Sequence, residues 1–524
     1  MDDVRDRRRG PARLQGARGA ELNVLVVGGG HNGLVAALHV ARGGADVTVL
    51  EHADRIGGAA TSVECTLPGF VHDSCAAFLP MAAVSPAMRE LGLDVDWVNP
   101  DTVLAHPFDD GTAIALHRDV DRTVESLGAA GPGWARAMQQ LLPHASAIAE
   151  AVLGRLPPVR AGTRVALGLN RDLVEWARRL LGSAEALGLD LFDGDRRATA
   201  WLSGSAQHSG LPPTAALSGA FGMLLQLTGH SHGWLLPRGG VQALTDALVR
   251  EATAAGATLR TGASVERIRL RGGRVVGVQL RGGEEVAGDA IISTVSATVL
   301  ARMLPEGALP GRLERRLKVW RAGTAPFKLD YALAGPMPWT AAEPRTSGVV
   351  HLAGPLEDLV RAADTARRGE VPERPALVVG QQSLHDPTRA PAGRHTLYVY
   401  GHVPARYEPS DDEVVARIEA QLDRFAPGWR SLVLARAQRS PAQTEAENPS
   451  LVGGDLAGGS YEIDQQLVFR PAPSLSRYKT PIDGLYMAGA STHPGGAVHG
   501  MSGRGAAQAL LRARRVRSLL PHPA

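Results

Sequence analysis

A short apolar strand that runs directly into a glycine-rich turn is the feature of the sequence that most restricts the fold. Residues 22–27 read Leu-Asn-Val-Leu-Val-Val and are followed at 28–33 by Gly-Gly-Gly-His-Asn-Gly. A helical pattern of apolar residues then runs to a glycine pair at 43–44, and the next apolar run, 46–51, has the composition of a buried strand. This order predicts a complete β-α-β unit, the start of a Rossmann-like α/β fold.

The glycines of this turn are suited to binding a dinucleotide. Gly28 allows the tight turn, Gly30 lets the backbone approach a pyrophosphate, and Gly33 permits close packing of the helix on the strand. The helix N-terminus offers free N–H groups to phosphates. Glu51, at the end of the second strand, can accept hydrogen bonds from both hydroxyls of an adenosine ribose. A glycine-rich turn without a ligand is the alternative, and the complete strand–turn–helix–strand context argues against it.

A second glycine pair favours FAD over NAD as the dinucleotide. Gly57 and Gly58 follow Glu51 closely, within the segment 54–61. A second turn without side chains lets the chain pass near the same pyrophosphate, as an extended FAD requires. Taken alone, the pair is equally typical of a surface turn.

Charge and aromatic content exclude a nucleic-acid partner. The formal net charge is +3, and the basic excess lies in the arginine-rich ends at 1–20 and 512–524, so the body of the chain is slightly acidic. Aromatic residues make up 4% of the chain, too few for a surface on which bases stack. The only two cysteines, Cys65 and Cys75, form neither a disulfide framework nor a C-x-x-C pair, which indicates a reducing, cytoplasmic location.

No membrane-spanning segment is expected. The longest apolar stretch, 215–227, is interrupted by polar residues and falls short of the roughly 18 apolar residues that a span needs, so it predicts a core helix. Acidic residues within 1–20 argue against a targeting peptide and favour a disordered arm. Peripheral contact with a membrane surface stays open.

Four motifs resemble those of a known family. The chain is similar to the glutathione-reductase-type flavoprotein superfamily, in the branch of amine oxidases and carotenoid desaturases, and within it to phytoene desaturases, carotene ketolases and the related pyridine-nucleotide-disulphide-oxidoreductase-domain proteins. The motifs are Arg55-x-Gly57-Gly58 after the first turn, Pro237-x-Gly239-Gly240 before a helix, the strand at 289–292, and the glycine-rich run 484–496. The resemblance covers residues 21–515.

The resemblance implies an α/β fold class. The implied fold comprises a Rossmann-like FAD-binding domain of glutathione-reductase type with an inserted α+β substrate domain and a helical subdomain. The implied division is a disordered arm at 1–20, an FAD-binding domain from 21–120, 233–305 and 455–515, a substrate domain from 121–232 and 306–454, and a tail at 516–524.

The resemblance also assigns the FAD-binding residues. Val265 holds the adenine through its backbone, Gly489 and Ala490 line the flavin, and a helix beginning near 498–500 directs its N-terminus at the flavin's pyrimidine edge. The complete expected set is Gly28, Gly30, His31, Asn32, Gly33, Glu51, His52, Arg55, Gly57, Gly58, Ala59, Val265, Gly489, Ala490, Gly496, Val498 and Met501.

Two residues are candidates for catalysis. Lys328 is one of only three lysines beside 53 arginines, and it lies in an alternating strand, 326–333. The family resemblance suggests that it holds a water beside flavin N5, while a solvent-facing lysine is an equal alternative. His493 lies within the C-terminal flavin motif, where packing within the loop is the alternative to contact with flavin or substrate. No metal ligand set is recognised; His230 and His232 lack accompanying carboxylates or cysteines.

These features predict an enzyme, an FAD-dependent dehydrogenase or desaturase. The expected reaction removes a hydride from a small apolar substrate, of isoprenoid or secondary-metabolite type. No second G-x-G-x-x-G motif is present for a separate nicotinamide nucleotide, so electrons are expected to pass to an external acceptor, oxygen or quinone. The alternatives are a flavin amine oxidase and a flavin-bound regulatory protein without turnover.

Overall fold

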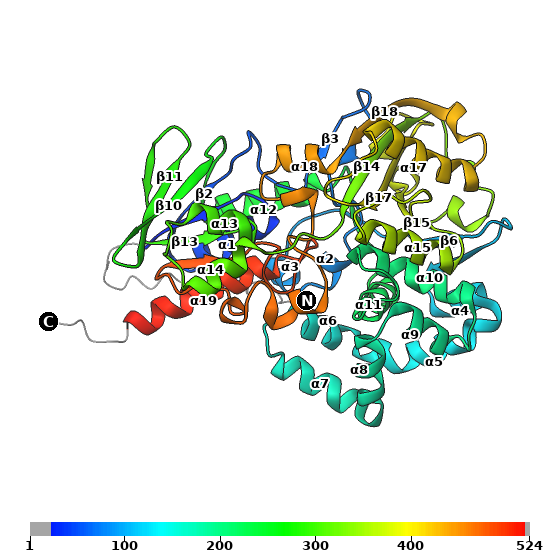
Figure 1. The fold of residues 1–524 in the computed structure, drawn as a ribbon, viewed down its shortest axis with the longest axis horizontal. Coiled ribbons are helices and arrows are strands. Elements are labelled where there is room, and N and C mark those ends of the chain that lie inside the picture. Colours follow the sequence, from blue (N-terminus) through cyan, green and yellow to red (C-terminus); the bar gives the residue numbers. More distant parts are fainter. Residues whose placement is uncertain (1–21, 519–524) are drawn as a thin grey trace, which may run out of the picture.

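Two lobes lie side by side in the computed structural model, which describes residues 22–518 (Figure 1). One lobe is built on a parallel sheet and the other on a larger mixed sheet, and a group of helices lies below the second lobe in this view. The predicted disordered arm at 1–20 lies outside the described residues, as does the predicted tail beyond residue 518.

The first lobe is a Rossmann-like α/β layer structure, as predicted. Its five parallel strands follow the order β19-β13-β1-β2-β9, and Val24 of the central strand lies between Ala290 and Val47. The strands come from three distant stretches of the chain: β1 (Asn23–Val27), β2 (Asp46–Leu50), β9 (Thr258–Arg260), β13 (Ala290–Ser293) and β19 (Leu485–Met487).

Both faces of this sheet are covered, because its short strands are apolar on both sides. Val24 and Val26 point into a core shared with three helices, whereas Leu25 and Val27 point into the core beneath a small antiparallel sheet. The helices of the first face are α1 (His31–Arg42), α12 (Gln242–Ala254) and α19 (Met501–Ser518). The second face carries β10 (Val265–Arg271), β11 (Arg274–Leu280), β12 (Glu285–Ala287), α13 (Ala297–Met303) and α14 (Gly311–Lys318).

The second lobe is a seven-stranded sheet in the order β18-β14-β17-β16-β15-β6-β7. Its strands are β6 (Thr102–Pro107), β7 (Ala113–His117), β14 (Ala325–Leu333), β15 (Val349–Leu352), β16 (Leu377–Gly380), β17 (His395–Val403) and β18 (Val433–Arg439). Its helices are α15 (Leu356–Arg367), α16 (Gln382–His385), α17 (Asp411–Phe425) and α18 (Pro441–Glu447).

Two strands of this sheet depart from the expected division of the chain. β6 and β7 lie within 21–120, the stretch expected to belong wholly to the FAD-binding domain. They join the second lobe because β6 pairs in parallel with β15, where Val349 faces Leu104. All six residues of β6 are buried. We therefore propose that the first segment of the FAD-binding domain ends before β6.

The helical group packs around large aromatic residues. Trp134, Trp176 and Trp201 are almost fully buried there. Its helices are α4 (Val120–Leu127), α5 (Gly131–Leu141), α6 (Ala145–Leu153), α7 (Val159–Leu169), α8 (Leu173–Leu181), α9 (Ala184–Leu191), α10 (Arg196–Ala206) and α11 (Ser218–Ser231). The connecting segments contain β3 (Ser62–Val63), β4 (His72–Asp73), α2 (Pro80–Val84), α3 (Pro86–Leu91), β5 (Trp97–Val98) and β8 (Leu236–Pro237). Within residues 22–518, the helices are too short or too polar to cross a membrane.

A buried arginine joins the two lobes at the Pro-x-Gly-Gly motif. Arg389 is fully buried and pairs with Asp73 at 2.6 Å and with Asp386 at 3.2 Å. The same two carboxylates accept hydrogen bonds from the backbone N–H groups of Val241 (2.8 Å) and Gly239 (2.7 Å). The motif before α12 is thereby attached to the second lobe.

Candidate active site

A first cavity of about 270 Å³ lies at the carboxyl ends of the parallel strands. This is the edge at which open α/β sheets bind ligands. Segments from all three stretches of the first lobe form its wall, together with residues near 448–458. The expected cofactor residues that it brings together are Gly28, Gly30, His31, Asn32, Gly33, Glu51, His52, Gly58, Ala59, Val265, Gly489 and Ala490.

The turn at the mouth of this cavity requires its glycines. Gly28 has φ of +100°, and a Cβ there would lie 2.2 Å from the hydroxyl oxygen of Thr294. A Cβ on Gly33 would lie 2.0 Å from the carbonyl oxygen of Gly28. The second glycine pair packs against this turn, since the N–H of Gly57 donates to the carbonyl of Gly29 at 3.0 Å.

Glu51 is held in place by the backbone around it. One carboxylate oxygen accepts from the N–H of Gly29 at 2.6 Å and the other from the N–H of Ala53 at 2.9 Å. Each oxygen keeps further acceptor capacity, and the side chain lines the cavity. This arrangement suits the hydroxyls of a ribose.

The residues present fit a phosphate-containing dinucleotide such as FAD. The first turn of α1 has no side-chain cap and no acidic residue, so its N–H groups face the cavity without a competing anion. The Nε2 atom of His31 is buried in the cavity wall and has no hydrogen-bond partner among the described residues. Burial lowers the pKa of His31 to about 4, so the ring is neutral and can bond to a ligand there.

A second cavity, also of about 270 Å³, adjoins the first. The two share His31, Ala59 and Leu456 in their walls. The second cavity is mostly apolar and takes its wall from both lobes and from α11. Gly496 and Val498, expected at the flavin, lie here. Its other residues include Phe78, Met81, Leu225, Trp234, Val349 and Val378, with His208, Tyr398, Tyr400, Tyr461 and Cys75 as its polar members.

Three expected cofactor residues lie outside the walls of these two cavities. Arg55 lines a smaller cavity of about 90 Å³ beside Glu51 and His52. Gly57 supports the turn from behind. Met501 begins α19 and packs in an apolar cluster with α2 and α6.

Lys328 is buried, which excludes the solvent-facing alternative. The side chain is on β14 and only 5% of the residue is exposed. Its ammonium forms an ion pair with Asp330 and lies 4.5 Å from the ring centroid of Tyr398. The hydroxyl of Tyr398 donates to the carbonyl of Cys75 at 2.5 Å. Lys328 is thus in contact with the wall of the second cavity but is not itself part of it.

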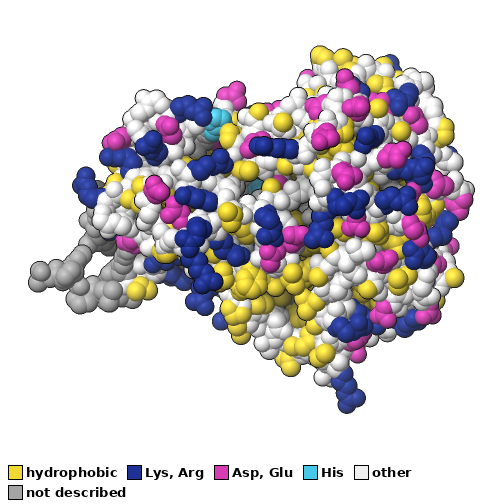
Figure 2. All heavy atoms as spheres, in the orientation of Figure 1, with side chains coloured by type: hydrophobic (Ala, Val, Ile, Leu, Met, Phe, Trp, Pro, Cys, Tyr) yellow, Lys and Arg dark blue, Asp and Glu magenta, His cyan; other side chains and the backbone are white. Residues whose placement is uncertain are grey.

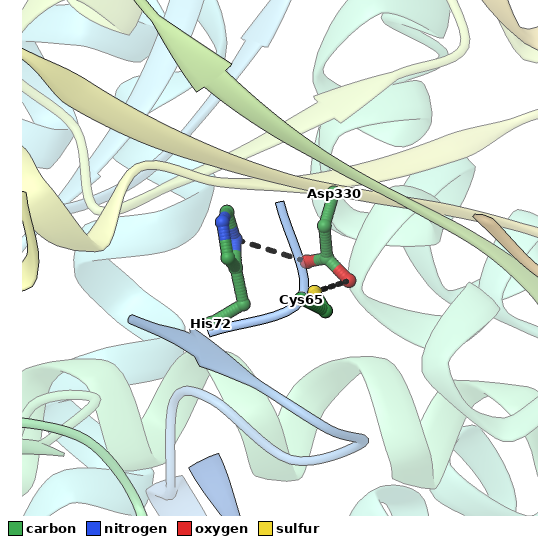
Figure 3. A group of neighbouring side chains, drawn as sticks. All are labelled: Cys65, His72 and Asp330. Atoms are coloured by element: carbon green, nitrogen blue, oxygen red, sulfur yellow. Dashed lines mark hydrogen bonds and ion pairs between the residues drawn. The ribbon is translucent and has the colours of Figure 1, made fainter. Parts of the chain in front are cut away.

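Cys65 and His72 converge on Asp330, the ion-pair partner of this lysine. Figure 3 shows the three converging side chains. The Nδ1 atom of His72 lies 3.4 Å from Oδ1 of Asp330, and the thiol of Cys65 lies 3.8 Å from Oδ2. Such a triad could ligate a metal ion, and sequence reasoning missed it because Asp330 lies 265 positions after Cys65 in the chain. However, the ammonium of Lys328 already neutralises the carboxylate, and partial burial together with the adjacent Asp330 raises the pKa of the Cys65 thiol to about 11. We interpret the group as an ion-paired cluster.

His493 contacts the helical group and lies outside the walls of both cavities. Its Nε2 atom donates to the carbonyl of Gly154 at 2.8 Å, and burial lowers the pKa of the ring to about 4. Its own carbonyl accepts from the hydroxyls of Tyr478 and Ser502. These contacts are those of a residue that positions the flavin motif against the helices.

Arg470 is a site residue whose role sequence reasoning missed. Its guanidinium is fully buried and bonds mainly to backbone carbonyls, which fixes the loop between the two cavities. The carbonyls belong to Ala457, Gly459, Ser460, Gln465 and Ala490. The polar wall formed by His208, Tyr398 and Tyr400 was missed as well, although the every-second-residue spacing of the two tyrosines on one strand is a local signal for it.

Comparison with known proteins agrees with this architecture. The family model described as flavin containing amine oxidoreductase matches residues 33–511. Pyridine nucleotide-disulfide oxidoreductase domain-containing protein 2 of Rattus norvegicus is 28% identical, with 94% of each chain covered. All-trans-zeta-carotene desaturase of Myxococcus xanthus is 27% identical, over 91% of this chain and 90% of that protein. The crystal structure of an oxidoreductase from Methanosarcina mazei has a TM-score of 0.61 at 18% identity, covering 94% of this chain and all of that one.

Substituting Gly30 tests the cofactor cavity without disturbing the turn. Gly30 has φ of −72°, and a Cβ there would approach no closer than 3.8 Å to the carbonyl of Gly57, so Gly30→Val is expected to fold. Its branched side chain fills the path of the pyrophosphate, and we expect the Kd for FAD to rise by about tenfold or more. FAD content of the purified protein and titration of the apoprotein measure this. Gly335→Val, at a surface loop with space for a Cβ, is the matched control and should retain FAD. Full FAD content in Gly30→Val would contradict the assignment.

Proposed function

The chain belongs to the family of flavin-containing amine oxidoreductases and is an FAD-dependent oxidoreductase, and from this premise we propose that it removes a hydride from a small apolar substrate of isoprenoid or secondary-metabolite type. The observation that carries the proposal is the second, largely apolar cavity, which adjoins the cofactor cavity at His31, Ala59 and Leu456. A relative named for the desaturation of a carotene supports the same substrate class.

The chain's own residues have three tasks in this reaction. The turn at 28–33 and Glu51 bind the dinucleotide, while the apolar wall orients the substrate and excludes water. When bound, FAD supplies the acceptor for the hydride that leaves the substrate carbon. We propose that Lys328 acts as a positioning residue, because its ammonium holds the ring of Tyr398 in the wall. We propose the same kind of role for His493, which fixes the flavin motif against Gly154.

Amine oxidation is the second candidate, and the aromatic wall is the observation that favours it. Tyr398, Tyr400, Tyr461 and Trp234 all line the second cavity, so the aromatic residues that a neutral amine requires are present. No carboxylate of the described chain lines that cavity to attract an ammonium group. For either substrate, we propose that electrons leave to an external acceptor, oxygen or a quinone.

Anaerobic mixing separates the two substrate classes. We expect the purified yellow holoprotein to lose its flavin absorbance when isoprenoid hydrocarbons or their alcohols and ketones are added without oxygen, because the substrate's electrons remain on the cofactor. Aliphatic amines should leave the spectrum unchanged. Bleaching by amines alone would favour the second candidate, and a spectrum that none of these compounds changes would contradict the proposed function.

Lys328→Met tests the positioning role. The change keeps the length of the side chain but removes the charge over Tyr398. We expect anaerobic reduction of the flavin to slow by about fivefold to tenfold, as when a charge-assisted contact worth roughly 1–1.4 kcal/mol is lost. The FAD content should stay the same. Lys318→Met is the matched control, since that lysine is half exposed and pairs with Glu314 on the surface of α14. Equal reduction rates in all three proteins would remove Lys328 from the mechanism.

We also propose peripheral contact with a membrane through α6 to α8. Hydrophobic side chains gather over α6 and α7 in Figure 2, and the exposed ones on these helices include Leu167 and Val174, each 77% exposed. Residues 150–181 carry six arginines against three acidic residues, so the surrounding charge favours anionic lipids. An apolar substrate held in a bilayer would then be close to the helical group.

Vesicle sedimentation tests this contact. The holoprotein should bind phosphatidylcholine vesicles more strongly when they contain phosphatidylserine, and Leu167→Glu combined with Val174→Glu should weaken binding by about tenfold or more, because two apolar anchors are lost. Val319→Glu, an equally exposed position on the first lobe, is the control. If the double variant binds as well as the wild type, these helices are not the contact.

A further inference from the structure

A polar strip interrupts the apolar wall of the second cavity. Tyr398 and Tyr400 are two residues apart on β17, so both side chains point to the same face of the sheet, into the cavity. His208, which follows α10, lies beside Tyr400 in the same wall. The hydroxyl of Tyr398 is committed to the carbonyl of Cys75, which leaves Tyr400 to be accounted for.

Tyr400 is the end of a chain of hydrogen bonds that leads away from the cavity. Its hydroxyl lies 3.2 Å from Nδ1 of His208. The Nε2 atom of His208 lies 2.9 Å from Nε2 of His351, a residue that is fully buried. Burial lowers the pKa of His208 to about 3 and that of His351 well below its usual value, so both rings are neutral. Two neutral rings that meet through their Nε2 atoms share one proton between them.

The far side of His351 decides which ring carries that proton. Its Nδ1 atom is buried and has no hydrogen-bond partner among the described residues. It faces Gly204, where a Cβ would lie 3.1 Å away. His106, whose Nδ1 faces the same glycine, donates through Nε2 to the carbonyl of Gly354 and forms no bond with His351. A buried N–H without a partner is rarer in proteins than a buried lone pair without one, so Nδ1 of His351 is the unprotonated nitrogen.

This assignment sets the direction of every bond in the chain. His351 then carries its proton on Nε2 and donates to His208. His208 carries its proton on Nδ1 and donates to the hydroxyl oxygen of Tyr400. The O–H of Tyr400 therefore has no acceptor among residues 22–518, and it is available to the cavity.

We infer that the substrate is apolar except for one oxygen that accepts a hydrogen bond, of the ketone, aldehyde or ether class, and that Tyr400 donates to this oxygen. The inference rests on the proposed function and narrows its substrate class. A pure hydrocarbon would leave the hydroxyl of Tyr400 buried against it without a partner, which is unfavourable. An ammonium group would meet a hydrogen-bond donor and no carboxylate in this wall.

Three probes with the same arrangement of non-hydrogen atoms test the inference by binding to the FAD-loaded protein. They are 4-phenylbutan-2-one, its alkene analogue 2-methyl-4-phenylbut-1-ene, which replaces the oxygen by a methylene, and 4-phenylbutan-2-amine. We expect Tyr400→Phe to raise the Kd of the ketone about fivefold, as loss of one hydrogen bond does, and to change that of the alkene by less than about twofold. The carbonyl stretching frequency of the bound ketone should be lower in the wild type than in Tyr400→Phe, because the hydrogen bond weakens the C=O bond.

Two further variants separate this role from a structural one. Tyr407→Phe removes a hydroxyl that donates to Asp411 outside the cavity and should leave all three Kd values unchanged. His208→Asn keeps an N–H directed at Tyr400 and should keep the ketone preference. His208→Leu removes the hydrogen bond that orients the hydroxyl of Tyr400 and should weaken the preference without abolishing it.

Any one of four results would overturn the inference. They are a ketone that does not bind, a Tyr400→Phe effect that is equal for the ketone and the alkene, a carbonyl stretching frequency that does not shift, and an amine that binds most tightly of the three probes. Its failure is distinguishable from failure of the proposed function. The latter is decided by anaerobic bleaching with isoprenoid compounds, whereas these readouts measure binding and need no turnover.

Discussion

The contact between two glycine-rich turns is the constraint on which the site depends. Gly33 allows the first turn of α1 to lie directly on the carbonyl of Gly28, and Gly57 donates its N–H to Gly29 from the opposite side. Side chains at these positions would separate α1 from β1 and the second turn from the first. Because one carboxylate oxygen of Glu51 accepts a hydrogen bond from the N–H of Gly29 in this turn, the end of β2 is held there too. The first cavity is the space that these close contacts leave.

Much of the first lobe could be predicted from the sequence because its signals are local. The two strands of the β-α-β unit lie within one residue of their expected bounds, and its helix ends at the expected glycine pair, since apolar periodicity and adjacent glycines specify them. The place of β6 and β7 could not be predicted, because it depends on pairing with a strand some 245 residues further along the chain (Leu104 with Val349). The same difference separates the two cavities. Most of the first is encoded in contiguous motifs, whereas the bond from Tyr400 to His208 joins residues 192 positions apart.

Buried cations connect the segments that the chain order separates. Arg389 is compensated by two carboxylates, Arg470 by backbone carbonyls and the nearby carboxylate of Asp455, and Lys328 by Asp330. Moving any of these charges from water into the protein is costly, so each is stable only while all its partners are in place. The planar guanidinium suits the first two sites, where several acceptors must be met at once. The ammonium of Lys328 contacts one carboxylate and one aromatic ring, and these two partners are sufficient to stabilise its single buried charge.

The neutral histidines beneath the second cavity carry the strongest argument about its occupant. An enzyme that only had to enclose a hydrocarbon could line the cavity with aliphatic residues and avoid the cost of burying polar rings. In this protein three histidine rings are buried behind Tyr400, those of His106, His208 and His351. Their pKa values are lowered so far that the rings cannot act as cations. Rings in this state cannot attract a charged substrate, and their remaining capacity is to fix the direction of a hydrogen bond. Because the bond runs from His351 through His208 to Tyr400, the network turns a residue that could either donate or accept into one that donates. A cavity with one such donor in an apolar wall distinguishes substrates by the presence and position of an acceptor oxygen.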